Sequence, residues 1–202
     1  MSAYLTIALA YVIGSLSFAV LTAMLFRLPD PRSYGSGNPG ATNVLRSGSK
    51  IAALVTLLGD ASKGAVAIWI ASALHEGSEQ RQVMMALAGL AAFLGHLYPV
   101  FFGFKGGKGV ATALGIVLAL NWKLGLLVLM IFVAVVLVTR YVSLASVLAA
   151  LLAAPLAVAL GGATTEVVVL SLVGLLIIWR HAANLRRLRD GTESKVLAKK
   201  QP

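Results

Sequence analysis

Residues 101–115 read FFGFKGGKGVATALG, a glycine-rich segment with two lysines that runs directly into an apolar stretch. Its glycines free the backbone to turn N–H groups toward a ligand, and Lys105 and Lys108 add positive charge beside them. A helix that begins at Val110 would offer further free N–H groups to an anion. Because a second apolar run, 83–102, precedes the segment, we expect a phosphate-binding loop at a membrane surface. The alternative is a tight turn whose lysines only set topology.

The segment is not a Walker loop. That motif is GxxxxGK followed by Ser or Thr, because the hydroxyl holds magnesium. Here Gly103 lies four residues before Gly107, one short of the motif, and Gly109 follows Lys108 where a hydroxyl is needed. We therefore do not expect ATP binding.

The composition is that of a membrane protein. Of the 202 residues, 59% are hydrophobic and 12% are charged, and the mean hydropathy is +0.90. About a quarter of the residues are charged in ordinary soluble domains. The net charge is +10. In a membrane protein, Lys and Arg mainly mark the cytoplasmic side and secondarily contact anionic lipid heads, so we do not expect nucleic acid as a partner. The lack of cysteine excludes disulfides, thiolate metal sites and cysteine nucleophiles.

The apolar runs predict an all-α integral membrane protein with seven transmembrane helices, forming a single polytopic domain over 1–202. The expected spans cover about 3–26, 51–74, 83–102, 110–122, 124–139, 147–160 and 166–179, and a basic cytoplasmic tail, 180–202, follows them. The fourth run is short for a full span, so we expect it to tilt or to thin the bilayer locally.

The basic residues orient these spans. With seven spans, all Lys and Arg except Lys63, Arg81 and Lys123 fall on one side of the membrane or in the tail. The positive-inside rule makes that side the cytoplasm. The N-terminus is therefore expected to be periplasmic and the C-terminus cytoplasmic, and the polar loops should share the cytoplasmic face.

Asp60, Lys63 and His96 are ionisable residues inside expected spans. Asp60 and Lys63 are three residues apart, so they share one helix face and can pair, either to order the bundle or to serve a site. Both roles stay open. His96 is expected to be a structural hydrogen-bonding group, because a metal site would need further ligands and none cluster near it. We expect no metal.

The expected cytoplasmic segments supply donors and cations but hardly any carboxylate. The first loop contains GSGNPGATNVLR at 35–46, a dense set of turn formers in which Arg46 offers a fork suited to phosphate. The third loop and the tail add further polar residues, namely Ser143, Ser146, His181 and Asn184. This inventory predicts an anionic ligand with more than one phosphate-like group.

Four segments carry a resemblance to a known family. They are GSGNPGATNVLR at 35–46, GHLYPVFFGFKGGKGVATALG at 95–115, YVSLAS at 141–146 and RHAANLRRL at 180–188. In this order they are similar to the signature segments of the bacterial acyl-phosphate:glycerol-3-phosphate acyltransferases, the PlsY family. The resemblance implies a seven-helix enzyme of the bacterial cytoplasmic (inner) membrane, multi-pass, with its active site on the cytoplasmic face.

The resemblance also implies a reaction. Such an enzyme moves a fatty acyl group from acyl phosphate to the 1-hydroxyl of glycerol 3-phosphate, releasing lysophosphatidic acid and inorganic phosphate in the first acylation of phospholipid synthesis. The implied partners are glycerol 3-phosphate, acyl phosphate, membrane lipids and the enzyme that supplies acyl phosphate. No metal or other cofactor is implied.

Site residues follow from the same resemblance, segment by segment. The catalytic group comprises Ser143, His181 and Lys105. The residues expected to bind glycerol 3-phosphate are Ser36, Arg46, Lys105, Ser143, His181 and Asn184. The residues expected to hold the acyl-donor phosphate are Asn38, Gly40, Thr42, Asn43, Gly106, Gly107, Lys108, Gly109 and Thr112. No role is given to Glu193.

These residue types suit the implied chemistry. An acyl phosphate is a mixed anhydride that is already activated, so the enzyme can work by positioning the hydroxyl and neutralising charge. Three groups are candidates for taking the proton of the hydroxyl: His181, Ser143 and a substrate phosphate. Acyl-chain length and oligomeric state are not indicated by the sequence.

Two other classes fit less well. Acyltransferases that use thioester donors commonly carry His-x4-Asp, yet the residues five after His75, His96 and His181 are Gln80, Phe101 and Arg186. The second class is a membrane transporter of a small organic phosphate. It would need polar residues throughout the spans, but here the spans are apolar and the polar groups gather at one face.

Overall fold

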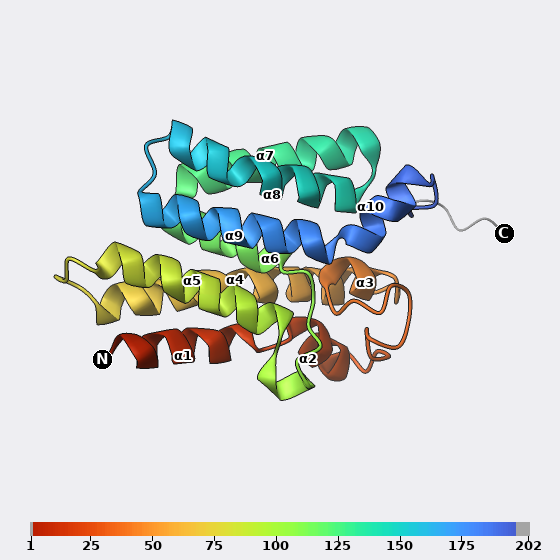
Figure 1. The fold of residues 1–202 in the computed structure, drawn as a ribbon. Coiled ribbons are helices and arrows are strands. Elements are labelled where there is room, and N and C mark those ends of the chain that lie inside the picture. The colour runs from red at the N-terminus through yellow and green to blue at the C-terminus, as the bar shows by residue number, and fades with distance from the viewer. Residues whose placement is uncertain (1, 197–202) are drawn as a thin grey trace. The chain divides into compact units, whose positions relative to one another are not determined.

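The computed structural model describes residues 2–196, and these form helices and connecting loops with no strand among them (Figure 1). The chain divides into two compact units, 1–120 and 121–202. The first unit contains α1 (Ala3–Gly14), α2 (Phe18–Leu25), α3 (Ala41–Leu45), α4 (Lys50–Leu74), α5 (Arg81–Leu97), the 3₁₀ turn η1 (Val100–Phe102) and α6 (Val110–Leu120). The second contains α7 (Trp122–Thr139), α8 (Val142–Ala159), α9 (Thr164–Arg180) and α10 (Ala182–Arg189).

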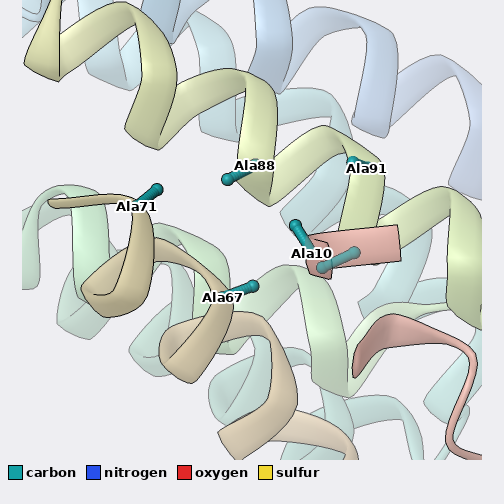
Figure 2. Close-up of a cluster of buried hydrophobic side chains, with 6 residues drawn as sticks. Ala10, Ala67, Ala71, Ala88 and Ala91 are labelled. Atoms are coloured by element: carbon teal, nitrogen blue, oxygen red, sulfur yellow. The ribbon is translucent and has the colours of Figure 1, made fainter. Parts of the chain in front are cut away.

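Small residues bring the helices of the first unit into close contact. Buried alanines of α1, α4 and α5 form one cluster, of which Figure 2 labels Ala10, Ala67, Ala71, Ala88 and Ala91. A Cβ on Gly115 of α6 would overlap the backbone of Ala61 in α4. Such close backbone approach is the usual packing of helices in lipid, where dispersion contacts replace the hydrophobic effect. Helix α4 consequently packs against both α5 and α6.

The expected span 3–26 is not one continuous helix. The chain breaks between α1 and α2, which bend by 43°. Ser15 folds back and donates its hydroxyl to the carbonyl of Tyr11 at 2.9 Å. The break exposes the carbonyl of Leu16, which accepts a hydrogen bond from Lys63 Nζ of α4 at 2.7 Å. The serines thus end the helix, and a lysine from another helix satisfies the carbonyl left over.

Four helical stretches among residues 2–196 are long and apolar enough to cross a membrane: α4, α5 with η1, α7 and α8. Two bent pairs, α1 with α2 and α9 with α10, raise the number to six if each is one span. Helix α6 has 11 residues and is shorter than a full span. A multi-pass membrane protein is therefore supported, while seven spans and the orientation of the termini stay predictions.

The region predicted as a third loop is largely helical. Helix α8 begins at Val142, five residues before the expected span 147–160. The chain reverses at Arg140, whose φ is 62°, and Thr139 Oγ1 accepts the N–H of Tyr141. Ser143 and Ser146 therefore lie in the first turns of α8. The prediction of a loop was wrong because serines were taken as a sign that the helix ends. A serine within a helix can instead donate to the carbonyl four residues before it, as Ser146 does to Val142 at 2.8 Å.

The start of the expected basic tail is also helical. Helix α9 ends at Arg180, and α10 continues after a bend of 55° at His181. Within the second unit α8 packs against α7 and α9, and α10 contacts α8 and α9. The end of the predicted tail, 197–202 with Lys199 and Lys200, lies outside the described residues.

Candidate active site

Asn43 organises the first polar loop. This asparagine is 2% exposed, and its Nδ2 donates to the carbonyls of Pro31 at 2.6 Å and Tyr34 at 3.1 Å. Its Oδ1 accepts the backbone N–H of Ser36 at 3.0 Å and Nη1 of Arg46 at 3.4 Å. Both ends of the amide are thus used by the loop itself. Asn43 was predicted to hold the donor phosphate, but these contacts give it the task of fixing Ser36 and Arg46.

Ser36 and Arg46 themselves are exposed at the surface of the first unit. Thr42 is exposed on α3, and Asn38 and Gly40 are half-buried just before that helix. The loop therefore presents a hydroxyl and a guanidinium held together by Asn43. A guanidinium and neutral donors together suit a phosphate.

The glycine loop follows η1 and leads into α6. Gly103 and Phe104 have φ values of 63° and 59°, so the chain reverses directly before Lys105, which is exposed. The N–H of Gly106 donates to the carbonyl of Leu97 at 3.1 Å, and that of Gly107 to the carbonyl of His96 at 3.2 Å. These two N–H groups bond to α5, which differs from the expectation that the glycines turn them toward a ligand.

The two loops of the first unit meet. A Cβ on Gly107 would lie 3.0 Å from the carbonyl oxygen of Pro39, and Arg32 lies over the Phe102 ring at 5.8 Å from its centre. The loops 35–46 and 103–109, which the sequence assigned to phosphate binding, are therefore neighbours. Thr112 is different, because it is 0% exposed and its side chain is enclosed within the unit. A direct contact between its hydroxyl and a phosphate does not fit this burial.

Gly109 offers a stability test of the loop. It adopts φ 81° directly before α6, and a Cβ there would overlap the Phe93 ring, whereas a Cβ on Gly103 meets nothing within 4 Å. Gly103→Ala should cost only the left-handed strain of about 1–2 kcal/mol. Gly109→Ala should add an overpacking cost of about 1–3 kcal/mol. Thermal unfolding in detergent measures both, and equal losses in the two variants would contradict the packing around Gly109.

A second polar cluster lies within the second unit. Ser143, His181 and Asn184 are 6%, 3% and 8% exposed. Asn184 Nδ2 donates to Glu193 Oε1 at 2.6 Å, and Arg187 Nε donates to Glu193 Oε2 at 2.7 Å. The Ser143 hydroxyl lies near this carboxylate and helps to lower its pKa, although Ser143 Oγ makes no hydrogen bond within the described part of the chain. Glu193 is thus held by Asn184 and Arg187 of α10 and lies near Ser143 of α8.

The ring of His181 has a defined orientation. Its Nδ1 lies 2.8 Å from the carbonyl oxygen of Ile177. Because a carbonyl oxygen only accepts, Nδ1 carries the proton in this contact, and the lone pair of the neutral ring is on Nε2. His181 therefore has a nitrogen that can accept a proton or a hydrogen bond.

Glu193 is the main residue of this cluster to which the sequence gave no role. Gly191 has φ 71° and turns the chain after α10, and the N–H groups of Thr192 and Glu193 both donate to the carbonyl of Arg187. This glycine cap aims the carboxylate back at α10. In the sequence, the position of Glu193 two residues after Gly191 was the signal that could have indicated a role. The partners of Glu193 are known only from the way α8 and α10 pack in the structure.

The pKa of Glu193 gives a pH-dependent prediction. Burial alone would raise the pKa of this carboxyl, but hydrogen bonds from Asn184 and Arg187, the nearby Ser143 hydroxyl and the charge of Arg187 outweigh burial and hold the pKa below its ordinary value. A carboxyl whose pKa is lowered by folding stabilises the folded state above its unfolded pKa, about 4.3, and loses this contribution as the pH falls through the folded pKa.

Glu193→Gln should therefore melt at a lower temperature than the wild-type protein at pH 6–7. The difference should shrink as the pH falls below about 4.3. Melting temperatures in detergent between pH 3.5 and 7 measure it. A difference that stays constant down to pH 3.5 would mean that the charge of Glu193 does not stabilise the fold.

The chain is similar to known proteins over most of its length. The family model described as glycerol-3-phosphate acyltransferase matches residues 4–191. The chain belongs to this family. Glycerol-3-phosphate acyltransferases of the family include those of Aromatoleum aromaticum, 52% identical over 95% of both chains, and Coxiella burnetii, 48% identical over 97% of this chain and 99% of the relative.

Solved structures of the family agree. The crystal structure of PlsY, an integral membrane glycerol 3-phosphate acyltransferase, in its glycerol 3-phosphate form is 39% identical with a TM-score of 0.89 and covers 96% of both chains. The lysophosphatidic acid form is 38% identical with a TM-score of 0.88, covering 96% of this chain and 95% of that one. The similarity thus extends over both units and includes every segment that carried the resemblance.

Proposed function

We propose that this protein transfers a fatty acyl group from acyl phosphate to the 1-hydroxyl of glycerol 3-phosphate, producing lysophosphatidic acid and inorganic phosphate. The observation that carries the proposal is the 0.89 TM-score to the glycerol 3-phosphate form of PlsY over 96% of both chains. A second PlsY structure holds lysophosphatidic acid, which is the product of this reaction. The acyl phosphate donor follows from the four family segments.

The family segments assign six residues to the acceptor substrate, glycerol 3-phosphate. In the first unit these are Ser36 and Arg46, which share the Asn43 amide, and the exposed Lys105. In the second they are Ser143, His181 and Asn184. A guanidinium and an ammonium neutralise the dianionic phosphate, and hydroxyl, imidazole and amide groups bind its oxygens or the glycerol hydroxyls.

The phosphate of the acyl donor is assigned to the two neighbouring loops, 35–46 and 103–109, which approach each other at Pro39 and Gly107. Lys108 supplies charge there, and Asn38, Gly40, Thr42 and Gly109 supply polar or backbone groups. Asn43, Gly106, Gly107 and Thr112 serve this phosphate by shaping the loops, since their polar groups bond within the fold or are buried. We expect the multi-pass chain to lie in the bacterial inner membrane with these loops on the cytoplasmic face.

The reaction needs positioning more than strong base catalysis. The 1-hydroxyl oxygen attacks the acyl carbonyl carbon, the bond from that carbon to the phosphate oxygen breaks, and inorganic phosphate leaves. Cations at the loops stabilise the charge that grows on the leaving phosphate. The hydroxyl proton passes to Nε2 of His181, to Ser143 or to a substrate phosphate. Nε2 of His181 has a lone pair suited to this step, because Nδ1 bonds to the Ile177 carbonyl.

Donor choice tests the proposal. Purified protein in detergent is given glycerol 3-phosphate with palmitoyl phosphate or with palmitoyl-CoA, and lysophosphatidic acid and inorganic phosphate are measured. We expect the two products in equal amounts from palmitoyl phosphate and no acyl transfer from palmitoyl-CoA. Transfer from palmitoyl-CoA would refute the donor assignment. Flux of glycerol 3-phosphate into proteoliposomes without either product would favour a transporter.

A further inference from the structure

Three buried ionisable side chains connect α4 to the end of α5. Asp60 and Lys63 of α4 are 2% and 3% exposed, and His96 of α5 is 7% exposed. Lys63 Nζ lies 3.0 Å from Asp60 Oδ1, and His96 Nδ1 lies 3.5 Å from the same oxygen. Ionisable groups inside a membrane bundle are costly, so they are kept where they perform a task.

One task is visible at Lys63. Its ammonium also donates to the carbonyl of Leu16, which the break between α1 and α2 leaves without a partner within its own helix. Lys63 therefore fixes the broken helix. The bond to Leu16 explains why a lysine stands at position 63, and Asp60 balances the charge of that lysine. Neither the Leu16 bond nor the ion pair explains why the Asp60 carboxylate also faces His96.

The glycine loop depends on that histidine twice. The carbonyl of His96 accepts the N–H of Gly107 at 3.2 Å, and the neighbouring carbonyl of Leu97 accepts that of Gly106 at 3.1 Å. The ring of His96 also lies directly against Gly107, because a Cβ there would overlap Nε2. Any rotation of the ring would therefore move Gly107 and, with it, Lys105 and Lys108 on either side.

We propose that Asp60 is a positioning residue for the glycine loop, holding the His96 ring so that Gly106 and Gly107 stay anchored to α5. The inference rests on the proposed function in that this loop serves the donor phosphate. The Asp60–Lys63–His96 cluster sets the place of the loop and does not touch substrate. Misplacing reacting groups by about 1 Å can cost a factor of 100 in rate, so a small shift of the loop is sufficient to matter.

Two variants separate positioning from simple packing. Asp60→Leu with Lys63→Met removes both buried charges together, which avoids leaving one unpaired, and it takes away the acceptor that faces His96. His96→Phe keeps a ring against Gly107 and leaves the Asp60–Lys63 pair intact. The control is His75→Ala. His75 caps the C-terminal end of α4, and its Nε2 contacts Thr6 Oγ1 of α1 at 3.1 Å, so it also joins these helices but lies about four helical turns beyond Asp60.

Amide hydrogen exchange is the first readout, because it does not depend on activity. We expect at least tenfold faster exchange at Gly106 and Gly107 in both test variants, with the amides of α7 and α8 unchanged. Wild-type exchange at both glycines in His96→Phe would overturn the proposal even if the double variant fails to fold. Equal acceleration in His75→Ala would also overturn it, because the effect would then be general loosening.

Steady-state kinetics is the second readout. We expect KM for palmitoyl phosphate to rise about tenfold in both test variants. KM for glycerol 3-phosphate should rise by a smaller factor, because Lys105 is the only one of its assigned residues that belongs to the glycine loop. A rise in both KM values by the same factor would refute selective positioning of the loop. If the wild-type protein transferred no acyl group, the proposed function would fail, while the exchange experiment would still decide the role of Asp60.

Discussion

Lys105→Ala should lower kcat/KM for acyl transfer by a factor of about 100 to 1,000, the usual cost of removing one group that stabilises developing charge. Lys105 follows two residues of positive φ, Gly103 and Phe104, which reverse the chain and expose the ammonium beside the anchored glycines. The loops around it bring few carboxylates, so its charge is available for phosphate. Alanine removes that charge while the backbone bonds of Gly106 and Gly107 remain.

Lys50→Ala is the matched control for Lys105→Ala. Lys50 is an exposed lysine of the same unit at the start of α4 and has no assigned role in the site. It should retain kcat/KM within twofold of wild type. Initial rates with palmitoyl phosphate and labelled glycerol 3-phosphate measure both variants. If Lys105→Ala kept more than a third of the wild-type kcat/KM, Lys105 would have no catalytic role.

Asn43→Asp is expected to disable the first loop. Asparagine donates two hydrogen bonds to the carbonyls of Pro31 and Tyr34, and aspartate would place a carboxylate oxygen against both. Leaving buried groups unsatisfied costs about 1–3 kcal/mol each, so the loop should detach or the unit should lose about 2–5 kcal/mol of stability. Ser36 and Arg46 would then lose their common support, and KM for glycerol 3-phosphate should rise more than tenfold.

Asn121→Asp gives the comparison for Asn43→Asp. Asn121 caps α7 with its Oδ1, which accepts the N–H of Leu124 at 3.2 Å. Aspartate can accept the same bond and suits a helix N-terminus, so this variant should keep its melting temperature and both KM values. Melting curves and initial rates test the pair. Equal behaviour of the two variants would contradict the role of Asn43 in holding the loop.

The sequence predicted what depends on local pattern. Long apolar runs identify α4, α5, α7, α8 and α9 within a few residues, because lipid requires about 20 apolar residues in each span. The glycine and asparagine loops were recognised because turn formers and cations gathered there. Membership of the family followed from four segments in order, and the family model and relatives confirm it.

The structure adds what depends on contacts between distant residues. The break at Ser15 and Leu16 was not foreseen, because it is satisfied by Lys63, which is 47 residues away. Ser143 was assigned to a loop, since hydroxyl residues interrupt an apolar pattern whether or not the backbone stays helical. Asn43 was predicted to bind a ligand, yet its amide nitrogen donates to the carbonyls of Pro31 and Tyr34. A short sequence motif does not reveal these two contacts.

Acyl transfer by matched variants from each unit tests the account most directly. Purified wild-type protein, Lys105→Ala and Ser143→Ala are given palmitoyl phosphate and radiolabelled glycerol 3-phosphate, and labelled lysophosphatidic acid is measured. We predict product from the wild-type protein and a loss of about 100-fold or more in Lys105→Ala and in Ser143→Ala, with melting temperatures preserved. No product from folded wild-type protein, or full activity in both variants, would contradict the account.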